Sequence, residues 1–245
     1  MEDLEKTRKI IKTTFFVAVV VITVFLVFPH DMKPHEWEIY ASSYFVTTLG
    51  LTVIGAAIGI LFGMLLAFFK FQKTGNEVFN MIKDAVIDEY VDIMRGTPMM
   101  LQLLTLSFVI VVFNNYWVAA IALGLNSAAY VEETIRSGIE SIDRGQMEAA
   151  RATGMPYRMA MNEIIMPQAV KNILPALVNE FINLFKETAV VGYISVVDIT
   201  MNSKSLQAVY YSVKPILFTG LVYYISVKLF SFIGKRLEMR LKEND

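Results

Sequence analysis

Long apolar runs separated by short polar segments dominate the pattern of this sequence. A helix that crosses a membrane needs about 17–25 mostly apolar residues. Six candidates occur in chain order, at residues 13–28, 44–69, 99–113, 116–131, 172–199 and 215–234. The third and the fifth are the least regular, because the third is short and the fifth contains Asn, Glu and Lys residues. The pattern predicts an all-α integral membrane protein with about six transmembrane helices.

Composition agrees with this class and excludes others. Hydrophobic residues make up 55% of the chain and the mean hydropathy is +0.50, which is high for a soluble domain. The formal net charge of −1 argues against nucleic acid as a partner. The chain has no cysteine, so it has no disulfide framework, thiolate metal site or cysteine nucleophile. His30 and His35 are expected to be ordinary surface residues, and we predict no metal site.

Lysine and arginine residues predict the orientation, because they concentrate in the cytoplasmic segments of membrane proteins. If the N-terminus is inside, the outer segments hold little beyond Lys33, Lys204 and Lys214. Both termini are therefore expected in the cytoplasm. The expected order is a basic cytoplasmic tail at 1–12, an additional N-terminal transmembrane helix at 13–28, an extracytoplasmic loop at 29–43, the main transmembrane domain at 44–235 and a cytoplasmic tail at 236–245.

Residues 1–28 could instead be a secretory signal peptide. The sequence FPHDMK that follows the apolar run offers no small-residue cleavage site, so we favour an uncleaved helix. In the second span, Gly55, Gly59 and Gly63 share one helix face, where another backbone can approach closely. Packing within the subunit is the favoured interpretation of these glycines, and a contact between subunits is the alternative.

A polar segment, EAARATGMPYRMAMNEIIMP at 148–167, interrupts the apolar pattern. Residues 145–153 are strong helix formers, and Gly154 can end that helix in a left-handed cap. Pro156 fits the first turn of a second helix that runs to about Pro167. The small side chains of Ala149 and Ala150 predict a flat surface that fits a groove of another protein, with a solvated loop as the alternative.

The same segment resembles the EAA motif of ATP-binding-cassette (ABC) importer permeases. The resemblance is carried by Glu148, Ala149, Ala150, Gly154, Ile164, Met166 and Pro167, with Met166 where the family pattern has leucine. Three further stretches are similar to polar amino acid permeases of the histidine, glutamine and arginine type: MRGTPMMLQLL at 94–104, AAYVEETIRSGIESIDRGQ at 128–146 and NEFINLFKETAVVGYI at 179–194. The resemblance covers about 44–235, so residues 1–28 would be a helix added to a five-helix core. Glu132 and Ala189-Val190 depart from the family pattern.

The resemblance implies a permease subunit of a polar amino acid importer in the cell membrane of a prokaryote. Two permease subunits, identical or siblings, would form the pathway, with ATPase subunits on the cytoplasmic side and an extracytoplasmic binding protein that delivers the amino acid. Residues 138–168 would form the coupling loop, and its ATPase-coupling residues would be Glu148, Ala149, Ala150, Gly154, Ile164 and Pro167. The chain has no G-x-x-x-x-G-K-[ST] loop. ATP and Mg²⁺ are therefore expected in the ATPase partner, and this chain is expected to hold no cofactor and no catalytic residue.

Polar residues within the spans are candidates for the substrate pathway. Asn179, Glu180 and Asn183 fall on one broad helical face together with Glu187. A carboxylate inside a membrane is costly unless it is paired or hydrated, which makes Glu180 a candidate for substrate contact. Pairing of Glu180 with a lysine or arginine, as a packing interaction, is the alternative.

Three weaker pathway candidates are Thr48, Thr52 and Gln102. Hydroxyl groups in spans often bond to carbonyls of their own helix, so their polarity alone does not indicate substrate contact. Glu132 and Glu133 are spaced to pair with Arg136, which favours a structural role.

The rival function is an ion-coupled secondary transporter or a channel that needs no ATPase. Such transporters often contain internal inverted repeats. No repeat is visible in this sequence, which favours the ABC importer.

Overall fold

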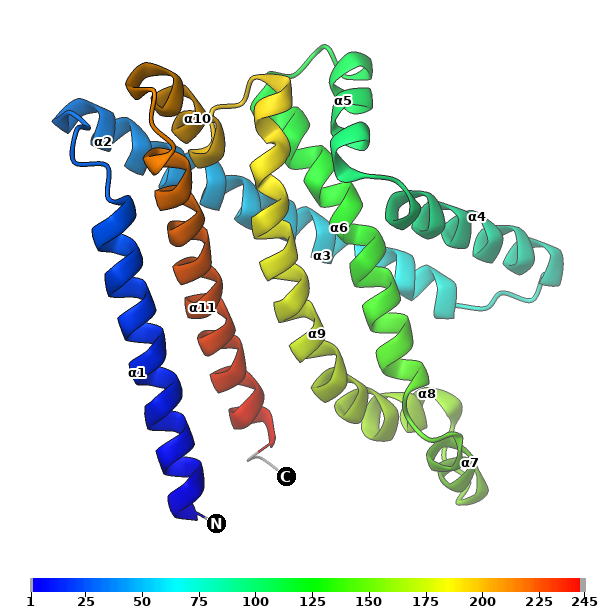
Figure 1. Cartoon of the computed structure of the whole chain (residues 1–245). Helices are drawn as coiled ribbons and strands as arrows, with labels where there is room; N and C mark the ends of the chain where they lie inside the picture. The colour runs from blue at the N-terminus through cyan, green and yellow to red at the C-terminus, as the bar shows by residue number, and fades with distance from the viewer. Residues whose placement is uncertain (1, 243–245) are drawn as a thin grey trace.

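The computed structural model describes residues 2–242, which form helices joined by short loops and contain no strand (Figure 1). The elements are α1 Glu2–Val27, α2 Pro34–Ser42, the π-helical η1 Ser43–Thr48, α3 Leu49–Phe71, α4 Glu77–Gly96, α5 Met99–Val109, α6 Asn115–Glu140, α7 Arg144–Ala152, α8 Tyr157–Ala160, the π-helical η2 Met161–Ile165, α9 Met166–Glu187, the 3₁₀-helical η3 Thr188–Ile194, α10 Ile199–Tyr210 and α11 Lys214–Lys242.

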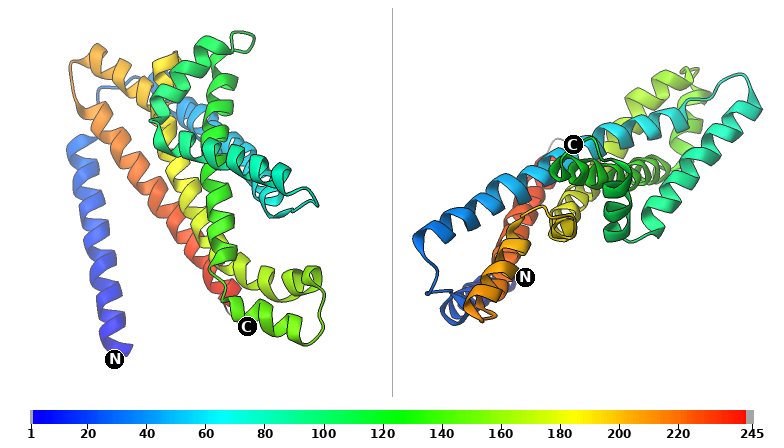
Figure 2. Two further views of the ribbon diagram at one scale, coloured as in Figure 1. Left: turned by 90° about the vertical axis from the view of Figure 1, so that its right-hand side faces the viewer. Right: turned by 90° about the horizontal axis from the view of Figure 1, so that it is seen from above.

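The axes of the long helices α1, α11, α9 and α6 are roughly aligned, and α3 crosses them at an angle (Figures 1 and 2). The Glu2 end of α1 and the Lys242 end of α11 lie at the end of the molecule that carries α7 and α8. This arrangement agrees with the expectation that both ends of the chain and the polar segment share one side of the membrane. The assignment of that side to the cytoplasm stays a prediction from the lysines and arginines.

Three helical stretches of the described chain are long and apolar enough to cross a membrane on their own, Lys6–Val27, Pro34–Phe71 and Lys214–Arg240. Helices α6 and α9 have 26 and 22 residues, which is long enough, but they carry more polar and charged residues. The all-α membrane class is therefore confirmed, and the number of six crossings stays a prediction.

The predicted third span, 99–113, is not a single membrane-crossing helix. Helix α5 has 11 residues, or about 16 Å, and ends at Val109. Before it lies α4, a helix that the sequence analysis missed and that begins where Asn76 caps the N–H of Phe79 at 3.1 Å. The two helices are separated at Thr97 and Pro98, because the residue before a proline is disfavoured in the α conformation.

Other predicted boundaries also differ. The expected loop at 29–43 contains α2, which continues through η1 into α3. Pro34 occupies the first turn of α2, and the carboxylate of Glu36 accepts the N–H of Lys33 at 2.7 Å, so the helix starts early. The expected tails at 1–12 and 236–245 are helical where they are described, and residues 1 and 243–245 lie outside the described part. The fifth span ends at Glu187 instead of 199, since η3 follows.

The glycine face of α3 packs against α6 within the subunit. A Cβ atom on Gly59 would lie 2.7 Å from Cβ of Ser127, and one on Gly63 would lie 2.6 Å from Cβ of Val131. Side chains at these positions would separate the two helices, so the interpretation as packing within the subunit is confirmed.

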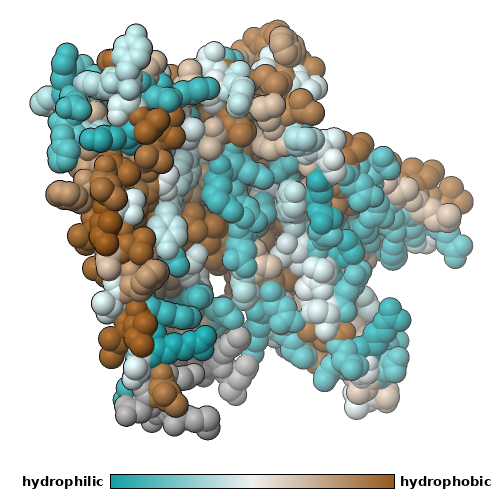
Figure 3. Space-filling model, in the orientation of Figure 1, coloured by the Kyte–Doolittle hydropathy of each residue, from teal (hydrophilic) through white to brown (hydrophobic). Residues whose placement is uncertain are grey.

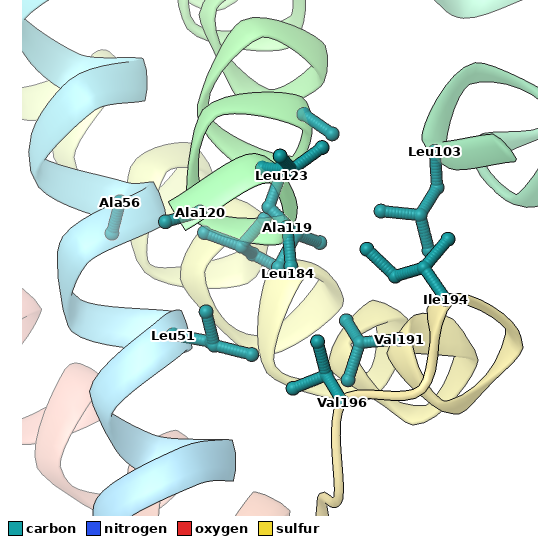
Figure 4. Packing of buried hydrophobic residues seen from close by; sticks show 12 residues of the cluster. Leu51, Ala56, Leu103, Ala119, Ala120, Leu123, Leu184, Val191, Ile194 and Val196 are labelled. Atoms are coloured by element: carbon teal, nitrogen blue, oxygen red, sulfur yellow. The ribbon is translucent and has the colours of Figure 1, made fainter. Parts of the chain in front are cut away.

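A buried apolar cluster joins this helix pair to α9. It includes Leu51 of α3, Leu123 of α6, Leu184 of α9 and Val191 of η3 (Figure 4). The cluster fixes the position of α9, which carries Glu180, against α6.

The predicted orientation can be tested by labelling α7 and α10 from one side of the membrane. The chain has no cysteine, so a single introduced cysteine reports one site. We expect Ala208→Cys, exposed on α10, to react with a membrane-impermeant maleimide in intact cells, and Ala152→Cys, exposed on α7, to react only after permeabilisation. The opposite pattern would reverse the orientation inferred from the basic residues.

Candidate functional site

The first part of the candidate site is a rigid turn after α7. Gly154 has φ of 86°, its N–H donates to the carbonyl of Arg151 at 3.0 Å, and the N–H of Met155 donates to the carbonyl of Ala150 at 3.2 Å. These two bonds and the left-handed glycine form a Schellman cap. The predicted left-handed end of this helix at Gly154 is therefore confirmed.

The second helix of this segment is longer than predicted. Helix α8 begins after Pro156 and passes through η2 into α9 without a break, so it does not end near Pro167. Pro167 lies inside this continuous helix, two residues after the π-helical turn of η2. The helical chain from Tyr157 to Glu187 thus connects the polar segment directly to the part of α9 that carries Glu180 (Figure 1).

The predicted coupling residues differ in their exposure. Glu148, Ala149, Gly154 and Pro167 are exposed, and Ile164 is half-buried. Ala150 is only 5% exposed, because α7 folds back on α8 and η2. The prediction that Ala150 belongs to a flat docking surface is therefore wrong, since its side chain lies inside the segment.

Two large side chains extend the exposed surface of the segment. Tyr157 and Met159 are 53% and 51% exposed, and neither was among the residues predicted for this surface from the sequence. Exposed aromatic and methionine side chains are enriched in protein interfaces. Helical spacing from Ala149 could not reveal them, since they lie beyond the Gly154 turn.

The second part of the candidate site is Glu180 on α9. Its side chain is buried, and its Oε1 accepts a hydrogen bond from the hydroxyl of Ser127 on α6 at 3.0 Å. No described lysine or arginine forms an ion pair with it. The alternative of an ion-paired packing residue is therefore not what the described chain shows.

The predicted polar face of α9 is not uniformly buried. Asn179 and Asn183 are exposed, Glu187 is half-buried, and Glu180 is turned toward α6. Lys186, which was not singled out from the sequence, is exposed one turn beyond Asn183. The subunit therefore presents two amides and an ammonium group on one side of a helix in the middle of the bundle.

A hollow of about 330 Å³ lies beside Lys186. Its other lining residues are Ala189, Tyr223, Tyr224 and Val227. Glu180 does not line it, so the hollow and the predicted pathway carboxylate are separate features of the isolated subunit.

Gln102 makes structural contacts. Its Nε2 donates to the carbonyl of Met94 at 2.7 Å and to the hydroxyl of Thr97 at 2.8 Å, and its Oε1 accepts from Nδ2 of Asn126 at 3.0 Å. These bonds satisfy carbonyls freed where α4 ends. The amide of Gln102 thus joins the α4–α5 break to α6.

Thr48 and Thr52 are fully buried and bond to their own helices. Their hydroxyls donate to the carbonyls of Ser43 at 3.1 Å and Thr48 at 2.7 Å, respectively. The Thr48 hydroxyl also accepts the N–H of Ile199 at 3.2 Å, which holds the start of α10. Asp198 caps the same helix, and burial raises the pKa of its carboxyl above the usual range.

An ion-pair cluster joins α3, α4 and α6 near the end of α3. Glu132 is fully buried, with its Oε1 3.8 Å from Nζ of Lys70 and 3.6 Å from Nε of Arg136. Glu133 lies 2.7 Å from a terminal nitrogen of Arg95 on α4. These contacts agree with the structural role expected for both glutamates.

The family follows from a comparison with known proteins. The model of the family described as "Binding-protein-dependent transport system inner membrane component" matches residues 59–243. The chain belongs to this family. It is a permease subunit of an ABC importer, and α1 lies outside the matched residues.

The relatives of this permease include amino acid transporters. The arginine transport system permease protein ArtQ of Bacillus subtilis (strain 168) is 41% identical over 204 residues, which cover 81% of this chain and 90% of that protein. The crystal structure of an amino acid ABC transporter with histidines matches with a TM-score of 0.74 and 36% identity, covering 82% of this chain and 93% of the other. The MetNI methionine ABC transporter matches with a TM-score of 0.70 at 18% identity, over 86% and 99%, which shows a shared fold.

Proposed function

We propose that this permease forms an amino acid pathway with a second permease subunit and is driven by an ATPase that docks on α7. One observation carries the proposal. Helix α7 is joined through the Gly154 turn to a continuous helical stretch that begins at Tyr157 and carries the buried carboxylate of Glu180. Movement imposed on α7 can therefore reach the pathway without crossing a flexible linker.

The exposed side of the coupling segment fits a protein groove. Ala149 and Ala152 present little relief, and Tyr157 and Met159 add apolar area. Glu148, Arg151 and Arg158 are exposed beside them and supply charges that can set the orientation of a partner. ATP and Mg²⁺ would be held by that ATPase partner, and no cofactor is assigned to this chain.

The second permease subunit is supported by the exposed polar face of α9. Asn179, Asn183 and Lys186 would be costly to expose to lipid tails. A second subunit, identical or a sibling, that faces this side would enclose a polar pathway between the two chains.

The proposed substrate class rests on Glu180, on the exposed polar face of α9 and on the relatives. Glu180 would contact a cation, either the α-ammonium group or a basic side chain, and Asn183 could add a hydrogen bond. Lys186 would attract the α-carboxylate. The names of the arginine permease and of the histidine-associated transporter support a polar amino acid. An extracytoplasmic binding protein would deliver it to this multi-pass protein of a prokaryotic cell membrane.

A pair of neighbouring alanines tests ATPase docking. Ala149→Glu should abolish co-purification of the ATPase while leaving the melting temperature of the permease unchanged, because Ala149 is exposed. Ala150→Glu should lower the permease's own stability by about 3–5 kcal/mol, because it places an unpaired charge in a buried site.

Ala208→Glu, on the exposed surface of α10, is the matched control and should change neither property. Normal ATPase co-purification with Ala149→Glu would show that this surface of α7 is not the docking site.

A further inference from the structure

Lys228 is a charged residue inside the most C-terminal apolar helix. It is exposed on α11, fourteen residues after Lys214 and seven before Lys235. At 1.5 Å per residue, these separations are about 21 Å and about 10 Å along the helix. Lys228 therefore lies in the half of the span that the basic residues assign to the cytoplasmic leaflet, and a charge at such a depth requires a partner.

The contacts of Lys228 within the chain are aromatic. Its Nζ lies 5.8 Å from the ring centroid of Phe16 on α1 and 5.5 Å from that of Tyr224 on α11. The two ring centroids are 5.9 Å apart. No described carboxylate lies within ion-pair distance of Lys228. Ring faces attract a cation only modestly, so the positive charge is not neutralised by this part of the chain.

The line along which α1 and α11 meet, at Phe16, Tyr224 and Lys228, is called the seam below. Two more lysines lie along this seam, nearer to the cytoplasmic side. Lys12 precedes Phe16 by four residues, which places it on the same face of α1. Lys235 follows Lys228 by seven residues, which places it on the same face of α11. Both are exposed, and neither forms an ion pair with a described carboxylate.

The surroundings of the seam are those of a lipid-facing surface. Exposed apolar side chains such as Phe15, Val19 and Ile22 surround α1. The α1 side of the space-filling view is correspondingly hydrophobic over much of its length (Figure 3). A soluble anion would have to enter this apolar surface to reach Lys228. A phospholipid already lies there, with its acyl chains along the apolar side chains and its phosphate at the headgroup level.

We propose that the seam between α1 and α11 binds the headgroup of an anionic phospholipid of the cytoplasmic leaflet. Lys228 is the deepest contact and extends its ammonium group toward the phosphate, while Lys12 and Lys235 contact the headgroup nearer the membrane surface. Basic sites between transmembrane helices on the cytoplasmic side are suited to anionic headgroups. Phe16 and Tyr224 hold the Lys228 side chain in place. The site does not depend on the proposed pathway or docking surface.

Native mass spectrometry of the assembled transporter in detergent tests the site. Phosphatidylglycerol and phosphatidylcholine are titrated separately, and the Kd of the first bound lipid is measured. We expect the wild-type complex to prefer phosphatidylglycerol, and Lys228→Gln to weaken that lipid's binding about fivefold, the effect of one basic residue near a headgroup. Lys228→Arg should retain binding. Lys204→Gln, an exposed lysine on α10, is the matched control and should bind as the wild type does.

Three results would overturn the proposal. The first is equal binding of the two lipids by the wild type, or unchanged phosphatidylglycerol binding by Lys228→Gln. The second is displacement of phosphatidylglycerol by excess inorganic phosphate, which would identify a soluble anion as the occupant. The third is loss of subunits from Lys228→Gln in phosphatidylcholine alone, which would assign Lys228 to a protein partner.

Discussion

Replacing Glu180 with glutamine is expected to lower ATP-driven amino acid uptake at least tenfold, with assembly and basal ATPase activity preserved. Glutamine keeps the shape of the side chain and can still accept the hydrogen bond from Ser127. It removes the negative charge that would face the substrate cation. A hydrogen bond to a charged group contributes about 1.5–3 kcal/mol, which corresponds to about 10–160-fold in affinity. Uptake into reconstituted vesicles, measured over a range of substrate concentrations, checks this expectation.

Two further variants separate substrate contact from packing. Glu38→Gln changes an exposed carboxylate on α2 and should leave uptake at the wild-type value. Ser127→Ala removes the hydroxyl that holds Glu180 and should weaken uptake less than Glu180→Gln does. If Glu180→Gln instead lowers the melting temperature and leaves the affinity and preference of the surviving complexes unchanged, Glu180 is a packing residue.

Replacing Gly154 with valine is expected to uncouple the transporter. Gly154 has φ of 86°, a conformation that a β-branched residue adopts only with strain of about 1–3 kcal/mol. Nothing surrounds the position at which a Cβ atom would be built, so strain of the backbone, rather than a clash, would be the cause. The Schellman cap would open and α7 would lose its fixed angle to α8. We expect uptake near background, while the permease still inserts into the membrane.

Gly154→Asn is the matched control, because asparagine tolerates the left-handed region better than other side chains. It should retain much of the uptake. Equal, near-normal uptake by the valine and asparagine variants would show that the geometry of this turn does not carry the coupling.

The sequence predicted the features that rest on local chemistry or on a fixed motif. The Gly154 cap follows from glycine's tolerance of positive φ at the end of a strong helix former, and the structure has it. Close packing at Gly59 within the subunit follows from the spacing of small residues, and the structure has it, with α6 as the partner helix. The helical membrane class needed only the apolar runs, and the family was indicated by the spacing from Glu148 to Pro167.

Features that depend on tertiary contacts could not be predicted in this way. Ala150 is buried only because α8 folds back beside α7, so its sequence neighbours gave no signal. The side-chain amide of Gln102 donates to a carbonyl that the break between α4 and α5 leaves without a helical partner, and that break was not expected. For α4 a signal did exist. Asn76 is a favourable cap, and Ile87 and Val91 lie four residues apart on its buried face, but the charged residues between them keep the segment from resembling an apolar span.

The most direct test of the account is uptake by vesicles that contain this permease, its ATPase and its binding protein. The account predicts accumulation of a polar amino acid that requires ATP, Mg²⁺ and the ATPase, and that is lost with Ala149→Glu. A proton or sodium gradient should not replace ATP. Uptake driven by an ion gradient through the permease alone, without ATP or ATPase, would contradict the account and identify a secondary transporter.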